Sequence, residues 1–375
     1  MDKQQSRRNA LKALTAGMAV SGIGCSGLTK ETKEVNVANS EMKANWQQTF
    51  DRTWLGGEYW ANPMEDWHIV NGGAECKSAS GSRTLHSLTH QIKDTGQAFN
   101  VSVVLQAIGD KNNEGGVGLR LGIRNEINEY RSNCFVQKGL DVGIVNGSLV
   151  IGKKSVDLSQ TIAENSVVLS LIAKPQDSVM KLTLTAKLLE TDEVLAQVSD
   201  MITAESVIGN IALVSNFAIK SNAKNTGLNR YRFLHWEMQG DAFDVNKANK
   251  FGPILWSMYT LNNSRSDNGY VLKLTAFTGP MGKSDNHDLE LQIKKEGTWV
   301  SFGKSVLDKD AWVATFKIPN WNETKDTDYR VIYQEKHKNG LQTPDVFSGK
   351  ILTNPSSDKF RMAALTCQND YSFPY

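Results

Sequence analysis

Hydrophobic and polar residues alternate with a period of two along much of the chain between residues 46 and 355. Clear examples are residues 98–107, 116–123, 166–173 and 180–188, and they are separated by turn sequences rich in Gly, Asn and Asp. Short alternating runs bounded by such turns are typical of strands that bury one face and expose the other. The pattern therefore predicts an all-β chain.

The number and spacing of these strands predict two successive β-sandwiches. Residues 46–241 hold enough strands for one two-sheet jelly roll. The last of these strands contains Trp236 and is followed by Gly240-Asp241, an order that resembles laminin-G/concanavalin-like domains. After a polar join, residues 251–355 contain short strands in the number of an immunoglobulin or fibronectin-III sandwich, which this region resembles.

The N-terminus has the features of an export signal, which we do not expect to belong to the fold. Ser6-Arg7-Arg8-Asn9-Ala10-Leu11-Lys12 resembles the twin-arginine signal Ser-Arg-Arg-x-Phe-Leu-Lys, with Ala10 in place of Phe. The apolar run that follows, Ala13 to Ile23, is too short to span a bilayer comfortably. Arg7 and Arg8 therefore predict export by the twin-arginine translocase, which carries folded proteins.

The signal ends in Gly22-Ile23-Gly24-Cys25, which resembles a lipobox with Gly22 in place of Leu. Residues 1–25 are thus predicted to be the signal peptide. Cys25 is then either the site of lipid attachment or a residue near an ordinary signal-peptidase cut. Residues 26–45 are polar and free of aromatic residues, and they predict a flexible tether. The expected location is periplasmic or cell-surface, with a membrane lipid anchor in the first case.

The net charge of +2 is misleading, because the signal region contributes most of the excess. The first 24 residues hold four of the 42 basic groups and one of the 40 acidic groups, so the remainder carries 38 against 39. Without a basic stripe, nucleic-acid binding has no electrostatic support. After the signal, no apolar run approaches the length of a membrane span.

Aromatic residues crowd the start of the first predicted sandwich. They are Trp46, Phe50, Trp54, Tyr59, Trp60 and Trp67. Such rings could stack on sugars, a use to which jelly rolls are often put. The alternative is that they pack this segment against the sandwich, since large aromatics dominate core burial. We favour packing.

His86 and His90 could bind zinc from one helix face, but no Glu follows His86 as in His-Glu-x-x-His. The stretch Thr84 to Ile92 is also more typical of a strand, which would place both histidines on one face of a sheet. Cys76 and Cys134 leave two alternatives open. In an oxidising compartment they could form a disulfide, whereas folding in the cytoplasm before export would favour two buried free thiols.

The C-terminal stretch combines a short apolar run, Met362 to Leu365, with the possible metal donors Cys367, Asn369 and Asp370. The residues alone leave two alternatives, a metal site or, more commonly, a strand that runs into an Asx-type turn. Ala364-Leu-Thr-Cys-Gln-Asn-Asp-Tyr371 resembles the opening strand of the catalytic domain in PhoD-like metallophosphatases, the alkaline phosphatase D superfamily. The resemblance implies that Cys367 is a ligand of an iron in a mixed-metal centre, with calcium as a further metal. It also implies that residues 360–375 are the first strand of a truncated α/β domain whose remaining ligands lie further on.

Two functions are expected, the first implied by the PhoD-like resemblance and the second by the predicted jelly roll. The first is the N-terminal part of an exported, metal-dependent phosphoesterase, inactive as this chain and binding no metal alone, because a single ligand cannot hold a multinuclear centre. The second is a surface-anchored glycan-binding or adhesion module without catalysis. Neither predicted sandwich contains a Ser/His/Asp or paired-carboxylate arrangement of diagnostic spacing, or a phosphate-binding loop.

Overall fold

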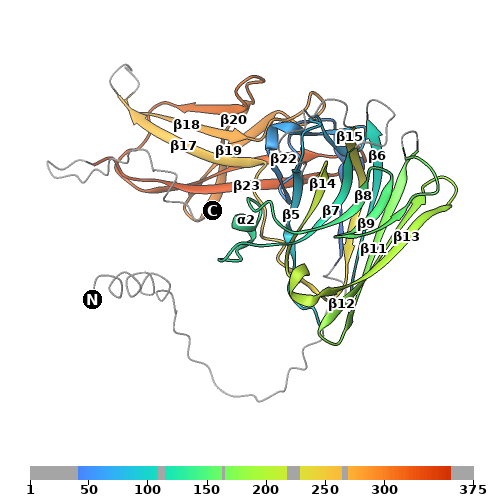
Figure 1. Cartoon of the computed structure of the whole chain (residues 1–375). Coiled ribbons are helices and arrows are strands. Elements are labelled where there is room, and N and C mark those ends of the chain that lie inside the picture. Colours follow the sequence, from blue (N-terminus) through green and yellow to red (C-terminus); the bar gives the residue numbers. More distant parts are fainter. Residues whose placement is uncertain (1–40, 109–114, 163–164, 218–228, 264–268, 356–375) are drawn as a thin grey trace, which may run out of the picture. The chain divides into compact units, whose positions relative to one another are not determined.

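The computed structural model describes residues 41–108, 115–162, 165–217, 229–263 and 269–355. The chain divides into two compact units, Met1–Val37 and Ala38–Tyr375, and all described residues belong to the second. Within that unit, antiparallel strands dominate (Figure 1). The prediction of an all-β chain is therefore confirmed for the described part.

Two eight-stranded sheets, here called sheet A and sheet B, form the first sandwich. Sheet A has the order β13-β12-β11-β6-β15-β4-β3, with β1 also paired to β15. Its strands are β1 (Met42–Lys43), β3 (Trp67–Val70), β4 (Gly73–Cys76), β6 (Phe99–Ile108), β11 (Val167–Gln176), β12 (Val179–Leu188), β13 (Val194–Thr203) and β15 (Arg230–Gln239).

Sheet B has the order β10-β9-β8-β7-β14-β5-β16, with β2 also paired to β5. Its strands are β2 (Tyr59–Asn62), β5 (Arg83–Ile92), β7 (Gly116–Ile123), β8 (Leu140–Val145), β9 (Ser148–Ile151), β10 (Lys154–Asp157), β14 (Gly209–Ser215) and β16 (Phe243–Val245). Between strands lie the short helices η2 (Trp46–Gln48), η3 (Met64–Asp66), α2 (Tyr130–Asn133) and η4 (Ala204–Val207).

Alternation along the strands builds the core between sheets A and B. On β6, for example, Val101, Val103 and Leu105 are at most 1% exposed and share one core with residues of sheet B such as Leu119 and Leu213. Burying each such side chain contributes roughly 1.5–3 kcal/mol. The period-two pattern therefore becomes one face of each sheet turned toward the other.

The second sandwich pairs a three-stranded sheet, β17-β18-β21, with a four-stranded sheet, β20-β19-β22-β23. The strands are β17 (Ile254–Asn262), β18 (Val271–Thr278), β19 (Asp288–Lys295), β20 (Thr298–Val306), β21 (Val313–Ile318), β22 (Thr327–Lys336) and β23 (Gln342–Ile351). Its separate, smaller core joins Leu272 and Leu274 of β18 to Leu289 and Leu291 of β19. Figure 1 shows these strands in yellow to red.

The first sandwich extends beyond the predicted limits of 46 and 241 at both ends. Strand β1 lies inside the predicted tether, because Met42 is only 4% exposed and pairs with Met238 of β15. Strand β16 lies in the predicted polar join, because the Phe243 ring packs against Phe99 with centroids 5.6 Å apart. A buried apolar side chain, Met42 in β1 and Phe243 in β16, thus accompanies each of these two additional strands.

Candidate functional site

The residues predicted at the two ends of the chain, Arg7, Arg8, Cys25 and Cys367, lie outside the described residues. Export, lipid attachment and metal ligation at these positions therefore stay predictions. Over the described ranges, no group of three or more His, Cys, Asp or Glu could hold a metal ion. No helix within those ranges is long and apolar enough to cross a membrane.

His86 and His90 lie on strand β5, so the prediction of a strand at this position is confirmed. The His86 ring bonds to Asn210 Oδ1 at 2.7 Å and to Thr84 Oγ1 at 2.9 Å. The His90 ring packs edge-on against Phe243, with centroids 5.8 Å apart. Burial lowers the pKa of both imidazoles to about 4. Both rings are neutral at pH 7 and serve as packed members of the sheet.

Cys76 and Cys134 are both buried free thiols, so the disulfide alternative is wrong in this structure. Cys76 Sγ donates to the carbonyl of Ser78 at 3.2 Å, and Cys134 Sγ donates to that of Tyr130 at 3.2 Å. Cys76 belongs to β4 of sheet A, whereas Cys134 follows α2, which contacts β5 and β14 of sheet B. Each thiol thus bonds to its own local backbone. Burial raises the pKa of both, to about 12 for Cys134.

The aromatic residues near the start of the first sandwich are mostly buried, which confirms the packing interpretation. Trp46, Trp54, Tyr59 and Trp67 are at most 2% exposed. Trp54 belongs to the core of the second sandwich and packs edge-on against Phe251, with centroids 4.9 Å apart. Trp54 was a candidate for sugar stacking, and its burial in a core excludes that role.

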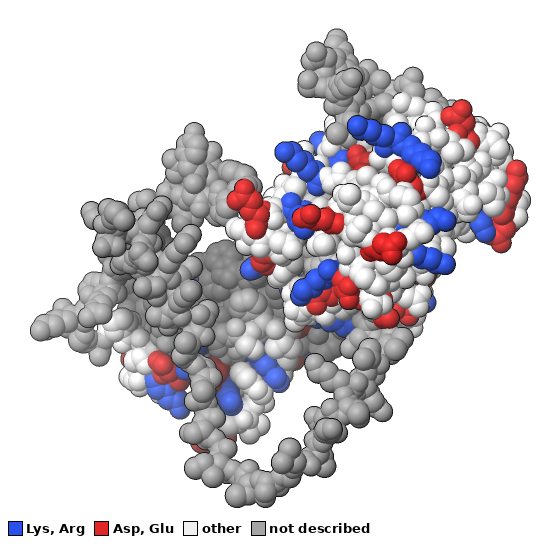
Figure 2. Space-filling model, turned by 60° about the horizontal axis from the view of Figure 1, so that its bottom comes forward, with Lys and Arg blue, Asp and Glu red and all other residues white. Residues whose placement is uncertain are grey.

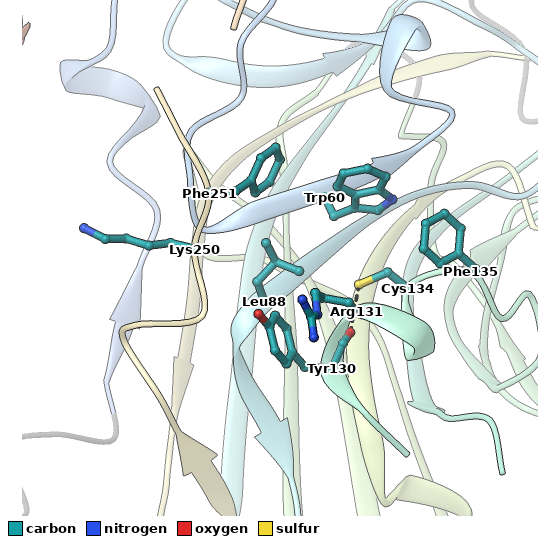
Figure 3. A pocket seen from close by; sticks show the side chains of 8 residues that line it. All are labelled: Trp60, Leu88, Tyr130, Arg131, Cys134, Phe135, Lys250 and Phe251. Atoms are coloured by element: carbon teal, nitrogen blue, oxygen red, sulfur yellow. Dashed lines mark hydrogen bonds between the residues drawn. The ribbon is translucent and has the colours of Figure 1, made fainter. Parts of the chain in front are cut away.

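Trp60 differs from these residues, because it is half-buried and lines an open recess. Figure 3 shows this recess, which has a volume of about 330 Å³. Its lining consists of Trp60, Leu88, Tyr130, Arg131, Cys134, Phe135, Lys250 and Phe251. Pockets of this size with mostly apolar walls are typical of small-ligand sites. We call it the Trp60 recess.

Leu88 lies at the centre of the Trp60 recess, between the aromatic rings (Figure 3). It is 4% exposed, yet it belongs to neither hydrophobic core. Strands β5 and β14 pair at Gln91–Asn210 and again at His86–Ala212. Between these two pairs β5 has four residues and β14 has one, so residues 87–90 of β5 form a bulge. Bulges redirect side chains at functional positions. Here Leu88 supplies an apolar floor outside the cores.

Residues 124–139, between β7 and β8, supply the wall; we call them the cover segment. Asn133, fully buried, fixes this segment: its Oδ1 accepts from Asn125 N at 3.0 Å and its Nδ2 donates to Asn128 Oδ1 at 3.0 Å. Asn62 of β2 donates to the carbonyl of Cys134. These bonds hold the wall through polar side chains, leaving its apolar side chains to line the recess.

Phe135 is 61% exposed at the rim of the Trp60 recess. Its ring meets Trp60 edge-on with centroids 5.6 Å apart, and Trp60 meets Phe251 at 5.5 Å. Arg131, also at the rim, pairs with Glu129 at 3.0 Å. Figure 3 shows the Lys250 chain directed away from the rings. The recess therefore has an aromatic wall and exposed cationic groups near its mouth.

A second, larger recess of about 510 Å³ lies where residues of the two sandwiches meet. Its buried cation, Arg52, is already bound to Asp285 at 3.3 Å and to Glu335 at 2.6 Å. The lining also includes Asp51, His68, Lys283, His287, Lys309 and Trp312. This recess is an ion-paired junction. On the face shown in Figure 2, basic and acidic side chains are likewise intermixed.

Of the residues in the Trp60 recess, the sequence had singled out only Trp60 and Cys134. Phe135, Leu88 and Phe251 were missed, since each carries an ordinary apolar side chain. A usable signal was the strand-free stretch from Arg124 to Gly139, a segment rich in polar residues that also contains the aromatic residues Tyr130 and Phe135. Long segments between strands are where binding residues gather.

Comparisons with known proteins name no family for this chain. No protein-family model matches it, and no curated protein does. Among solved structures, it is similar to basic winged bean lectin at 9% identity, over 54% of this chain and 98% of the lectin, with a TM-score of 0.37. Arcelin-5 from Phaseolus vulgaris gives 8% identity, coverages of 55% and 100%, and a TM-score of 0.36. Likenesses this distant assign no function.

Proposed function

We propose that the first sandwich is a non-catalytic glycan-binding module with the Trp60 recess as its site. One observation carries this proposal: the rings of Trp60 and Phe135 form an open wall, 61% exposed at Phe135, outside both hydrophobic cores. The C–H face of a sugar ring packs well against such an aromatic surface. Arg131, which is exposed and lines the recess, is available for hydroxyl groups at the mouth.

We also propose a specific fold class for each of the two sandwiches. A concanavalin-like jelly roll for the first sandwich is supported by its two eight-stranded antiparallel sheets. A fibronectin-III-like module for the second is supported by its sheets of three and four strands. A fold does not by itself imply a function, so the glycan proposal depends on the recess.

The test is a glycan array probed with the full chain. We expect specific binding that Trp60→Ala or Phe135→Ala reduces about tenfold, since each removes an aromatic contact worth about 1.4 kcal/mol. Trp256→Ala is the matched control, because Trp256 is 51% exposed on the second sandwich. An array without signal, or binding equally weakened by the control, would contradict the proposal.

A second candidate is an exported PhoD-like phosphoesterase, favoured by the Thr366-Cys367-Gln368 sequence. Among the described residues, no group of three or more His, Cys, Asp or Glu could hold iron or calcium. We expect the 375-residue chain to leave a chromogenic phosphate ester uncleaved, with or without iron and calcium. Turnover that disappears in Cys367→Ala would contradict this expectation and favour the enzyme.

Export to the periplasm or cell surface is proposed from the twin-arginine resemblance. Replacing both Arg7 and Arg8 by Lys should retain the protein in the cytoplasm, since the translocase reads this pair. Cys25→Ser should release an exported chain from the membrane fraction if Cys25 carries lipid. Unchanged fractionation of both variants would contradict these assignments.

A further inference from the structure

The interior of the Trp60 recess leaves a ligand few groups with which to form hydrogen bonds. Trp60 Nε1 already donates to Asn62 Oδ1 at 3.0 Å. The Cys134 thiol is committed to the Tyr130 carbonyl at 3.2 Å. The side chains of Leu88 and Phe251 contribute only carbon atoms, and the remaining uncharged polar group of the lining is the Tyr130 hydroxyl (Figure 3). The charged side chains of the lining are exposed, so they belong to the mouth.

This distribution of polar groups determines which part of a ligand binds more favourably inside the Trp60 recess. A hydroxyl that loses water without finding a partner weakens binding by roughly tenfold, and a sugar ring carries several. Each methylene that leaves water strengthens binding by about fourfold. A volume of about 330 Å³ accommodates a short alkyl or acyl chain. The apolar part of a ligand therefore enters more favourably than a bare sugar.

We infer that the recess binds amphiphilic saccharides, with an alkyl or acyl chain over Leu88 and the sugar at the rim against Phe135. This assignment rests on the glycan-binding function proposed above and adds which end of the ligand enters. The exposed Arg131 side chain is available to the sugar hydroxyls in partly aqueous surroundings, where hydrogen bonds cost little desolvation. The buried chain would supply most of the affinity, and the sugar the selectivity.

The experiment uses the full chain and the uncharged fluorophore N-phenyl-1-naphthylamine, whose emission rises in apolar sites. Octyl and methyl glycosides of glucose, galactose and mannose compete for the probe, together with octanol. We expect at least one octyl glycoside to displace the probe at concentrations at least about a hundredfold lower than its methyl counterpart. That octyl glycoside should also be more effective than octanol.

Phe135→Ala should weaken displacement by the octyl glycoside by about tenfold, because the ring is the rim contact of the sugar. Leu341→Ala is the matched control, since Leu341 is 65% exposed on the second sandwich, and it should change nothing. Both side chains are exposed, so both variants should fold. Equal loss in the control, or none in Phe135→Ala, would place the probe elsewhere and overturn the inference.

The two proposals fail in different ways. If methyl glycosides compete as well as octyl glycosides, the recess takes bare sugar, and the inference falls while the glycan function stands. If octanol competes as well as every octyl glycoside, the sugar is not recognised, and the glycan function falls with the inference. Array binding without any displacement of the probe would also overturn only the inference.

Discussion

The outer surfaces of the two sandwiches use tryptophan differently. On the first, Trp60 is half-buried between Phe135 and Phe251, over a floor made by Leu88. On the second, Trp256 is 51% exposed and stacks on its cross-strand neighbour Phe277, with centroids 4.9 Å apart. A cross-strand pair covers part of a sheet surface. A recess with walls arises where a segment between strands folds over that surface.

The cover segment makes this difference. Its polar side chain Asn133 holds the backbone of the segment in place through hydrogen bonds to Asn125 and Asn128. Its apolar side chains are thereby free to line a cavity. Buried polar networks that are fully satisfied rigidify the structure around them. The hydrogen bonds of Asn133 thus hold in place the wall that lines the recess.

The largest expected effect is on the free energy of unfolding, and it compares the buried Trp54 with the exposed Trp256. Trp54→Ala should lower the free energy of unfolding by about 3–5 kcal/mol, because it leaves a cavity in the second core. Trp256→Ala, at 51% exposure, should change it by less than about 0.5 kcal/mol. Urea denaturation followed by tryptophan fluorescence and by circular dichroism measures both. Similar losses in the two variants would show that Trp54 is not a core residue.

The second prediction concerns the pH dependence of stability. It depends on His86 and His90, which both lie on β5 of the first sandwich. Both imidazoles have a pKa of about 4 in the folded chain against an ordinary 6.5, because burial disfavours the charged form. The unfolded chain takes up these protons as the pH falls below about 6.5, while the folded chain does not until about 4. Stability should therefore fall across this window, by up to about 3 kcal/mol per histidine.

His86→Gln removes one of these two contributions, so its unfolding free energy should depend less steeply on pH between 7 and 4. Urea denaturation at intervals of one pH unit measures the slope. Ser87→Ala is the control on the same strand, 1% exposed and without a titrating group, and it should lower stability equally at each pH. A slope in His86→Gln identical to that of the parent would refute the assignment of His86.

The third prediction tests the cover segment. Asn133→Ala should destabilise the chain by about 1–3 kcal/mol, because it removes two hydrogen bonds that this fully buried side chain makes, to Asn125 N and to Asn128 Oδ1. It should also reduce binding of N-phenyl-1-naphthylamine. Asn339→Ala, in an exposed turn of the second sandwich, should cost less than about 0.5 kcal/mol and leave the probe unaffected. Undiminished probe binding in Asn133→Ala would mean that the segment does not depend on this anchor.

The smallest expected effect on stability comes from Phe135→Ala, at less than about 0.5 kcal/mol, because the side chain is 61% exposed. The same variant should lose most of its ligand binding. Denaturation and displacement assays on one preparation compare the two quantities. A loss of stability as large as that of Trp54→Ala would make Phe135 a packing residue and remove it from the site.

Strand positions were largely predictable, because alternation between buried and exposed residues is visible in neighbouring residues alone. The errors lie at the ends of the first sandwich, where Met42 and Phe243 stand in polar stretches too short to show a period. The role of Trp54 could not be predicted, because it lies between strands β1 and β2 of the first sandwich yet packs in the core formed by residues 254–351. Nor could the thiols of Cys76 and Cys134 be assigned, since pairing depends on which backbone groups surround them.

The sequence by itself predicted the all-β character, the succession of two sandwiches and the strand that holds His86 and His90. These follow from local periodicity, which acts over a few residues and does not depend on the rest of the chain. Only the tertiary structure decided that Trp60, Leu88, Phe135 and Phe251 meet around one cavity. A cavity is made by residues distant in sequence, and its existence depends on a bulge and an anchored segment that no local pattern specifies.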